Sequence, residues 1–108
     1  MRHRAILLVN TNPASEERTD DFNNWYSEVH IPQILERVPG VVAARRYRLD
    51  EASPIQPAHR YLAVYEIEAD EPASVVGAMK EAADTGSLDS TDALDRSLPM
   101  AVALYREI

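Results

Sequence analysis

Residues 59–68 read His-Arg-Tyr-Leu-Ala-Val-Tyr-Glu-Ile-Glu, and the fold prediction starts from this stretch. Its side chains alternate: tyrosine, alanine and isoleucine fall on one face, and leucine and valine fall on the other. Successive side chains of a β-strand point to opposite faces of the sheet, so the alternation predicts a strand. The charged residues Arg60, Glu66 and Glu68 lie near the ends of this strand.

Three more strands are predicted around it. A short run of branched apolar residues over 4–10 predicts the first strand, and a partly alternating pattern over 41–49 predicts the second. Residues 100–108 predict a closing strand, and residues 50–58, with two prolines, predict a mobile loop.

Two helices separate these strands. Apolar residues recur at helical spacing from Phe22 to Val38. Pro32 has no amide hydrogen and should kink or restart this helix, which places His30 at a break. A second helix should begin near residues 70–72 and end at Gly86, and the polar stretch that follows should hold one helical turn over 90–94. The order β-α-β-β-α-β predicts an α+β, ferredoxin-like domain: a four-stranded antiparallel sheet with both helices on one face.

The composition narrows the possible functions. The chain has 108 residues, 45% of them hydrophobic, which predicts a single domain over residues 1–108. Eighteen acidic against eleven basic residues, a net charge of -7, argue against nucleic acids and anionic membranes as partners, since phosphate binding needs clustered Lys and Arg. The absence of cysteine excludes disulfides and thiolate chemistry. The apolar run over 5–9 is too short for an export or membrane segment, so we expect a cytoplasmic protein.

The two faces of the predicted sheet are expected to differ. The residues expected to face the helices are Leu62, Val64, Val102 and Leu104. The residues expected on the opposite face are Tyr61, Ala63, Tyr65, Ala101, Ala103 and Tyr105, joined by Ala43, Arg45 and Tyr47. A bare face this apolar should be covered by a second copy of the chain, which predicts a homodimer. Tyrosines between alanines would leave space there for a small molecule; alternatively, the alanines only let two sheets approach and no cavity remains.

One segment resembles a known family. Residues 22–32, Phe-Asn-Asn-Trp-Tyr-Ser-Glu-Val-His-Ile-Pro, followed by Val38-Pro39-Gly40-Val41 and Arg46-Tyr47, resemble the signature of the EthD-like branch of the dimeric α+β barrel proteins. The resemblance implies a homodimer whose two sheets close into a barrel, with a pocket between helices and sheet or within the barrel. His30 and Pro32 match the family's His-x-Pro.

The chain also departs from that family's pattern. EthD-like members often carry a basic residue after the first strand, where this chain has Asn10-Thr11-Asn12. The set of residues used by haem-degrading members has no convincing counterpart, so no haem is expected. Members include lactone isomerases, polyketide cyclases, dehydratases and metal-free monooxygenases, so the fold leaves the reaction open.

Several residues are candidates for the chemistry. His30 titrates near neutral pH and could act as a general acid or base; alternatively, it is a half-buried histidine that caps helix carbonyls. Tyr65 is the second catalytic candidate, because a phenol can polarise a carbonyl by hydrogen bonding. Arg45 or Arg46 could hold a carboxylate or enolate, but neighbours on one strand face opposite sides. The substrate-binding candidates are Trp25, Tyr26, Arg45, Tyr47, Tyr61 and Tyr105, although core packing is the simpler role for Trp25.

These residues predict a small-molecule enzyme that needs no cofactor. It would isomerise, cyclise or dehydrate a hydrophobic, carbonyl-bearing substrate, such as a polyketide-like molecule, a lactone or an aromatic, with His30 moving the proton. No metal site is expected, because no His and carboxylate set has ligand spacing. The alternatives are a cofactor-free monooxygenase of the same fold and a non-catalytic metabolite-binding or accessory dimer.

Overall fold

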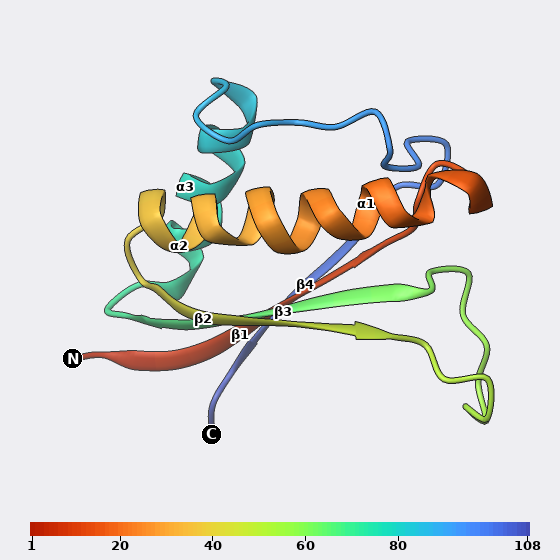
Figure 1. Ribbon diagram of the computed structural model, residues 1–108. Coiled ribbons are helices and arrows are strands. Elements are labelled where there is room, and N and C mark those ends of the chain that lie inside the picture. The colour runs from red at the N-terminus through yellow and green to blue at the C-terminus, as the bar shows by residue number, and fades with distance from the viewer.

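A computed structural model describes all 108 residues and shows one four-stranded sheet covered on one side by helices (Figure 1). The strands are β1 (His3–Thr11), β2 (Val41–Arg48), β3 (Tyr61–Ala69) and β4 (Ala101–Arg106). They are ordered β2-β3-β1-β4, and every neighbouring pair is antiparallel. This arrangement confirms the predicted α+β, ferredoxin-like fold.

The helices form two packing units. The first unit is a continuous run of η1 (Glu16–Arg18), α1 (Thr19–Trp25), the π-helical turn η2 (Tyr26–His30) and α2 (Ile31–Arg37). The second is α3 (Pro72–Asp84), which ends just before Gly86, a residue with a positive φ of 83°. Both lie on the same face of the sheet, as Figure 1 shows. None of these helices is long and apolar enough to cross a membrane.

The orientation predicted for β3 is wrong. Tyr61, Ala63 and Tyr65 face the helices, because they pair with Thr11, Val9 and Leu7 of β1, whose side chains are buried beneath the helices. Tyr65 is 1% exposed, and it sits in the centre of the core. An alternating strand can bury either of its faces, and the tyrosine face is the one that the helices cover.

The orientations predicted for β2 and β4 are confirmed. Val102 and Leu104 lie opposite Val9 and Leu7 and therefore face the helices. The opposite side, which we call the outer face, carries no helix. Its residues are Ile6, Leu8, Asn10, Ala43, Arg45, Tyr47, Leu62, Val64, Glu66, Ala101, Ala103 and Tyr105.

The helical turn predicted over 90–94 is also wrong. This part of the chain is irregular, with bends at Asp92 and Ala93, and Leu94 forms an isolated bridge with Pro13. The amide of Ala14 donates to the carbonyl of Ala93 at 2.6 Å, and the amide of Asp95 donates to the carbonyl of Asn12 at 2.9 Å. The Thr91 hydroxyl accepts from the Ala93 amide, so side-chain and cross-chain hydrogen bonds replace those of a helix.

Candidate functional site

A cavity of about 590 Å³ lies between the helices and the helix-facing side of the sheet. It is mostly apolar, since 13 of its 21 lining residues are hydrophobic. The side chains come from strands β1, β3 and β4, from the helical elements α1, η2, α2 and α3, and from the segment between α3 and β4. Leu7, Ile34, Val76 and Met79 are among the apolar ones. Its volume and lining suit a small apolar ligand.

The π-helical turn places two aromatic side chains on this cavity. Pro32 stands in the first turn of α2 and has no amide hydrogen, so the regular helical hydrogen bonding is interrupted there. The Ile31 amide donates instead to the Tyr26 carbonyl, five residues back. Tyr26 and His30, at the two ends of the turn, both line the cavity. The predicted restart near Pro32 is therefore confirmed, and single π turns of this kind are frequent at functional sites.

His30 is packed between aromatic rings. Its ring stacks on Trp25, with centroids 4.4 Å apart and planes inclined by 20°. It meets Tyr26 edge-on, at 5.1 Å and 89°. Burial in this apolar setting lowers the pKa of His30 from 6.5 to about 4, because desolvation disfavours the imidazolium. The imidazole is therefore neutral at neutral pH and able to accept a proton.

Two tyrosine hydroxyls, that of Tyr26 from the π turn and that of Tyr65 from β3, lie close together at the helix–sheet interface. Burial raises the pKa of Tyr65 well above its ordinary value, and the nearby Tyr26 phenol raises it further. Burial also raises the pKa of Tyr26, and the neighbouring hydroxyls of Tyr65 and Thr11 oppose that rise. Both phenols thus stay protonated at neutral pH and can donate hydrogen bonds.

Three polar atoms around the cavity are buried without a hydrogen-bond partner: Trp25 Nε1, His30 Nδ1 and the Tyr65 hydroxyl. Leaving such an atom unpaired costs about 1–3 kcal/mol, and most buried polar groups are paired. All three belong to residues that line one cavity, so a water molecule or ligand that reaches them there would supply the missing hydrogen bonds. No three His, Cys, Asp or Glu side chains lie close enough together to hold a metal ion.

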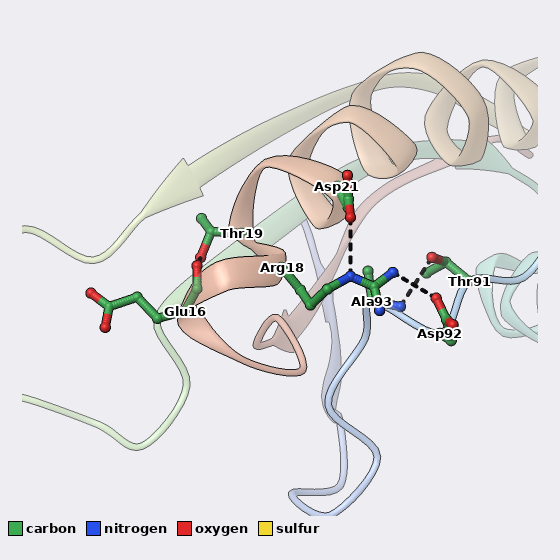
Figure 2. Close-up of polar contacts among 7 residues, drawn as sticks. All are labelled: Glu16, Arg18, Thr19, Asp21, Thr91, Asp92 and Ala93. Carbon is green, nitrogen blue, oxygen red and sulfur yellow. Dashed lines mark hydrogen bonds and ion pairs between the residues drawn. The ribbon is translucent and has the colours of Figure 1, made fainter.

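The segment after α3 closes one side of the cavity. Figure 1 shows it running back along the helices toward the start of α1. At the far end, Arg18 donates to Asp21 at 3.0 Å and to Asp92 at 2.7 Å, as Figure 2 shows. At the near end, the Gln33 amide exchanges two hydrogen bonds with Asp89. These contacts hold Ser90 and Thr91 against the cavity.

The structure brings together four of the predicted site residues. Trp25, Tyr26, His30 and Tyr65 line the same cavity. Tyr61 shares the helix-facing side but packs against Phe22, at 5.2 Å between ring centroids, and does not line it.

The other three predicted site residues lie on the outer face. Arg45 pairs there with Glu66 at 3.3 Å, and Tyr47 is 51% exposed. Tyr105 lines a separate hollow of about 550 Å³ together with charged residues such as Arg4 and Glu68. Arg46, and not Arg45, faces the helices, so the expectation that only one of the two does so is confirmed.

Some residues that line the cavity were not predicted from the sequence. Thr11 is 3% exposed and lines the cavity from the end of β1, a position that only the sheet register reveals. Arg96 and Met100 line it from the irregular segment before β4. That segment has no periodicity from which its inner side could have been found.

No protein-family model matches the chain, and no curated protein is significantly similar to it. Solved structures are similar over almost the whole chain. An EthD-family protein from Bacillus halodurans C-125 is 12% identical with a TM-score of 0.58, and the match covers 98% of this chain and 99% of that one. A provisionally assigned monooxygenase from Shewanella loihica PV-4 is 15% identical with a TM-score of 0.60, covering 100% and 97%. A dimeric ferredoxin-like protein of unknown function from Jannaschia sp. CCS1 is 13% identical with a TM-score of 0.58, covering 97% and 99%. The chain therefore has the ferredoxin-like fold of EthD-like proteins.

Proposed function

We propose that the chain is an enzyme that moves a proton on a hydrophobic, carbonyl-bearing small molecule bound in the helix–sheet cavity. The observation that carries this proposal is the set of three unpaired polar atoms, on Trp25, His30 and Tyr65, around a largely apolar cavity. An apolar wall would bind the body of such a molecule, and the polar atoms would orient its oxygen.

The proposed reaction begins with His30 as the base. Its neutral imidazole takes a proton from the carbon beside the carbonyl: the C–H bond breaks, an N–H bond forms, and the electron pair moves onto the carbonyl oxygen. Tyr65 donates a hydrogen bond to that oxygen and stabilises the enolate. If a double bond is conjugated with the enolate, return of the proton from the imidazolium to its far carbon completes an isomerisation. If the β-carbon carries a hydroxyl, the carbonyl re-forms, a double bond forms between the α- and β-carbons, the β C–O bond breaks, and the leaving hydroxyl takes the imidazolium proton to become water.

The low pKa of His30 fits the role of base in one respect and opposes it in another. It keeps the imidazole neutral down to acidic pH, but it also makes the imidazole a weak base. Both effects come from desolvation, which penalises an isolated imidazolium. An enolate formed beside the imidazolium offsets this penalty, because opposite charges attract strongly in a water-poor site.

We also propose that the chain forms a homodimer through the outer face. This face leaves Ile6, Tyr47 and Tyr105 between 38% and 55% exposed. Apolar surface of this kind favours a partner, and two copies of one face make a closed two-fold assembly. The Jannaschia protein of the same fold is described as dimeric, which supports this assembly. The outer hollow that contains Tyr105 would then be covered by the second sheet.

Hydrogen exchange at carbon tests the proposed reaction without knowledge of the natural substrate. The chain is incubated in D₂O with 2-tetralone and a panel of other apolar ketones and lactones, and proton NMR follows deuterium uptake beside the carbonyl. We expect enzyme-dependent uptake that His30→Gln slows by about 10²- to 10⁴-fold, the contribution typical of a general base. Tyr65→Phe should slow it by about 10²-fold through loss of the oxyanion donor.

His59→Gln is the matched control for the base. His59 does not line the cavity, and its Nε2 lies 2.8 Å from the carbonyl oxygen of Pro99. This variant should exchange deuterium at the wild-type rate. Uptake that His30→Gln and Tyr65→Phe leave unchanged would contradict the proposal.

Oxygen-dependent oxidation of an electron-rich aromatic is the second candidate, because the Shewanella structure of the same fold is a provisionally assigned monooxygenase. Neutral His30 could deprotonate a phenol as well as a carbon acid. Incubation of hydroquinones with the chain under ¹⁸O₂ distinguishes the two reactions, since only a monooxygenase reaction inserts an ¹⁸O atom into the product. A ligand that is retained in the cavity but neither exchanged nor oxidised would instead indicate a binding module.

A further inference from the structure

Arg46 is a half-buried cation without a carboxylate partner. It projects from β2 toward the helices, whereas its neighbour Arg45 projects to the outer face and pairs with Glu66. No salt bridge includes Arg46, although the chain has more acids than bases. A partly buried charge is usually neutralised by an opposite one, so an unneutralised guanidinium next to a cavity calls for a reason.

The hydrogen bonds of Arg46 go to the π turn and the helix before it, and its guanidinium also lies 5.9 Å from the ring centroid of Tyr61 on β3. Its Nη2 donates to the Asn23 Oδ1 at 2.8 Å, and its Nη1 donates to the Ser27 hydroxyl at 3.1 Å. The guanidinium lies over the Tyr26 ring, 4.5 Å from the centroid. Arg46 therefore contacts the same ring that meets His30 edge-on.

We infer that Arg46 is a positioning residue whose uncompensated positive charge, acting through Tyr26 and Tyr65, stabilises a negatively charged substrate oxygen in the cavity. This inference rests on the proposed function and adds to it the class of ligand that the site prefers: a phenolate or enolate anion over the corresponding neutral molecule. Arginine suits this role because its charge persists at any physiological pH and its planar head can stack on a ring while donating hydrogen bonds.

The electrostatics of the tyrosines agree with the geometry. The charge of Arg46 lowers the pKa of Tyr26 and that of Tyr65, against the larger effect of burial. A positive charge that makes a phenol more acidic also makes it a stronger hydrogen-bond donor to an anion. A carboxylate paired with Arg46 would cancel this effect, since the field of a close ion pair falls off steeply.

Binding of 4-nitrophenol tests the inference, because this probe mimics an enolate when ionised and is coloured in that form. Its affinity for the chain is measured by absorbance titration at about pH 8.5 and about pH 5.5, where the phenolate and the phenol predominate. His30 stays neutral at both values, since its pKa is about 4. We expect the wild-type chain to bind the phenolate more tightly than the phenol.

Three variants separate the effect of the positive charge of Arg46 from the effect of its hydrogen bonds to Asn23 and Ser27. Arg46→Gln keeps donors toward Asn23 and Ser27 but loses the charge, and it should weaken phenolate binding about tenfold while changing phenol binding by less than about twofold. Arg46→Lys keeps the charge and loses the planar fork, and it should retain most of the phenolate preference. Arg48→Gln is the matched control, because it removes the same charge from an exposed position on the same strand and should change neither affinity.

Two outcomes would overturn the role of Arg46. One is an equal loss of phenol and phenolate binding in Arg46→Gln, which is what a merely structural tether predicts. The other is loss of the phenolate preference in Arg46→Lys while its circular dichroism spectrum stays native. The deuterium exchange of the His30 variants tests the reaction separately: a chain that prefers phenolate through Arg46 but exchanges no deuterium would contradict the reaction and leave the anion preference standing.

Discussion

The stack of Trp25 on His30 makes the protonation of the candidate base visible. Trp25 is the only tryptophan of the chain, and its ring lies 4.4 Å from the imidazole. An imidazolium quenches indole fluorescence at contact, whereas a neutral imidazole quenches it far less. Acidification from neutral pH should therefore reduce the emission with a midpoint at about pH 4, because burial lowers the pKa of His30 to about 4.

The same protonation should appear in the stability of the chain. The pKa of His30 is 6.5 in the unfolded chain and about 4 in the folded one, so between these values the unfolded state binds one more proton. Stability should consequently be highest above pH 6.5 and fall as the pH is lowered toward 4. At ~1.4 kcal/mol per pKa unit, the total loss from this group is about 3 kcal/mol.

Urea unfolding of the wild type and of His30→Phe at pH 7 and about pH 4.5 measures this loss. Phenylalanine keeps a ring against Trp25 but cannot bind a proton, so the variant should lose about 2–3 kcal/mol less between the two pH values. His59→Gln, which changes a histidine outside the cavity, should behave like the wild type. A fluorescence midpoint near 6.5, or a pH dependence that His30→Phe leaves unchanged, would refute the argument that burial holds His30 neutral.

Three further predictions concern the turn at Gly40, the proposed dimer and the loop between β2 and β3. Gly40→Ala should destabilise the chain by about 1–3 kcal/mol in urea unfolding, because Gly40 has φ +99° and an added Cβ would lie 2.7 Å from a methyl of Val75. Gly77→Ala is its matched control. No atom lies within 4 Å of a Cβ added at Gly77, which is in α3, so this change should stabilise the chain by about 0.5–1 kcal/mol. Val64→Glu, on the outer face, should convert the proposed dimer to a monomer in analytical ultracentrifugation, and an unchanged sedimentation coefficient would contradict the interface. Asn12→Ala removes two hydrogen bonds that hold the β2–β3 loop and should speed proteolysis within residues 50–58 several-fold, without moving the emission of Trp25.

The order of the elements was predictable because their signals are local. Alternation over 59–68 is a property of neighbouring residues, and so is the proline that interrupts the first helix. The placement of His30 at the resulting irregularity followed from Pro32 alone, and the structure adds that the irregularity is a π turn. The short polar segment over 90–94 was mispredicted because its hydrogen bonds go to distant residues, including Asn12.

The membership of the candidate site was only partly predictable. Trp25 and Tyr26 could be assigned together with His30, since all three belong to one helical run. Tyr65 lines the candidate cavity, although from the face of the sheet opposite to the predicted one, and Tyr105, which was predicted beside it, lies on the outer face. Arg46 was considered only as an alternative to Arg45, since adjacent residues on a strand are equivalent until one face is known to be buried.

The sequence by itself thus determined the succession of helices and strands, the alternation of side chains along each strand, and the place of His30 beside a proline. Tertiary structure alone decided which face of β3 is covered, and so which of its tyrosines lines the cavity together with the histidine. The physical reason is that an alternating strand satisfies its local preferences with either face buried. The choice comes from pairing with β1, where Leu7 and Tyr65 lie side by side, and from the helices that pack over both of them.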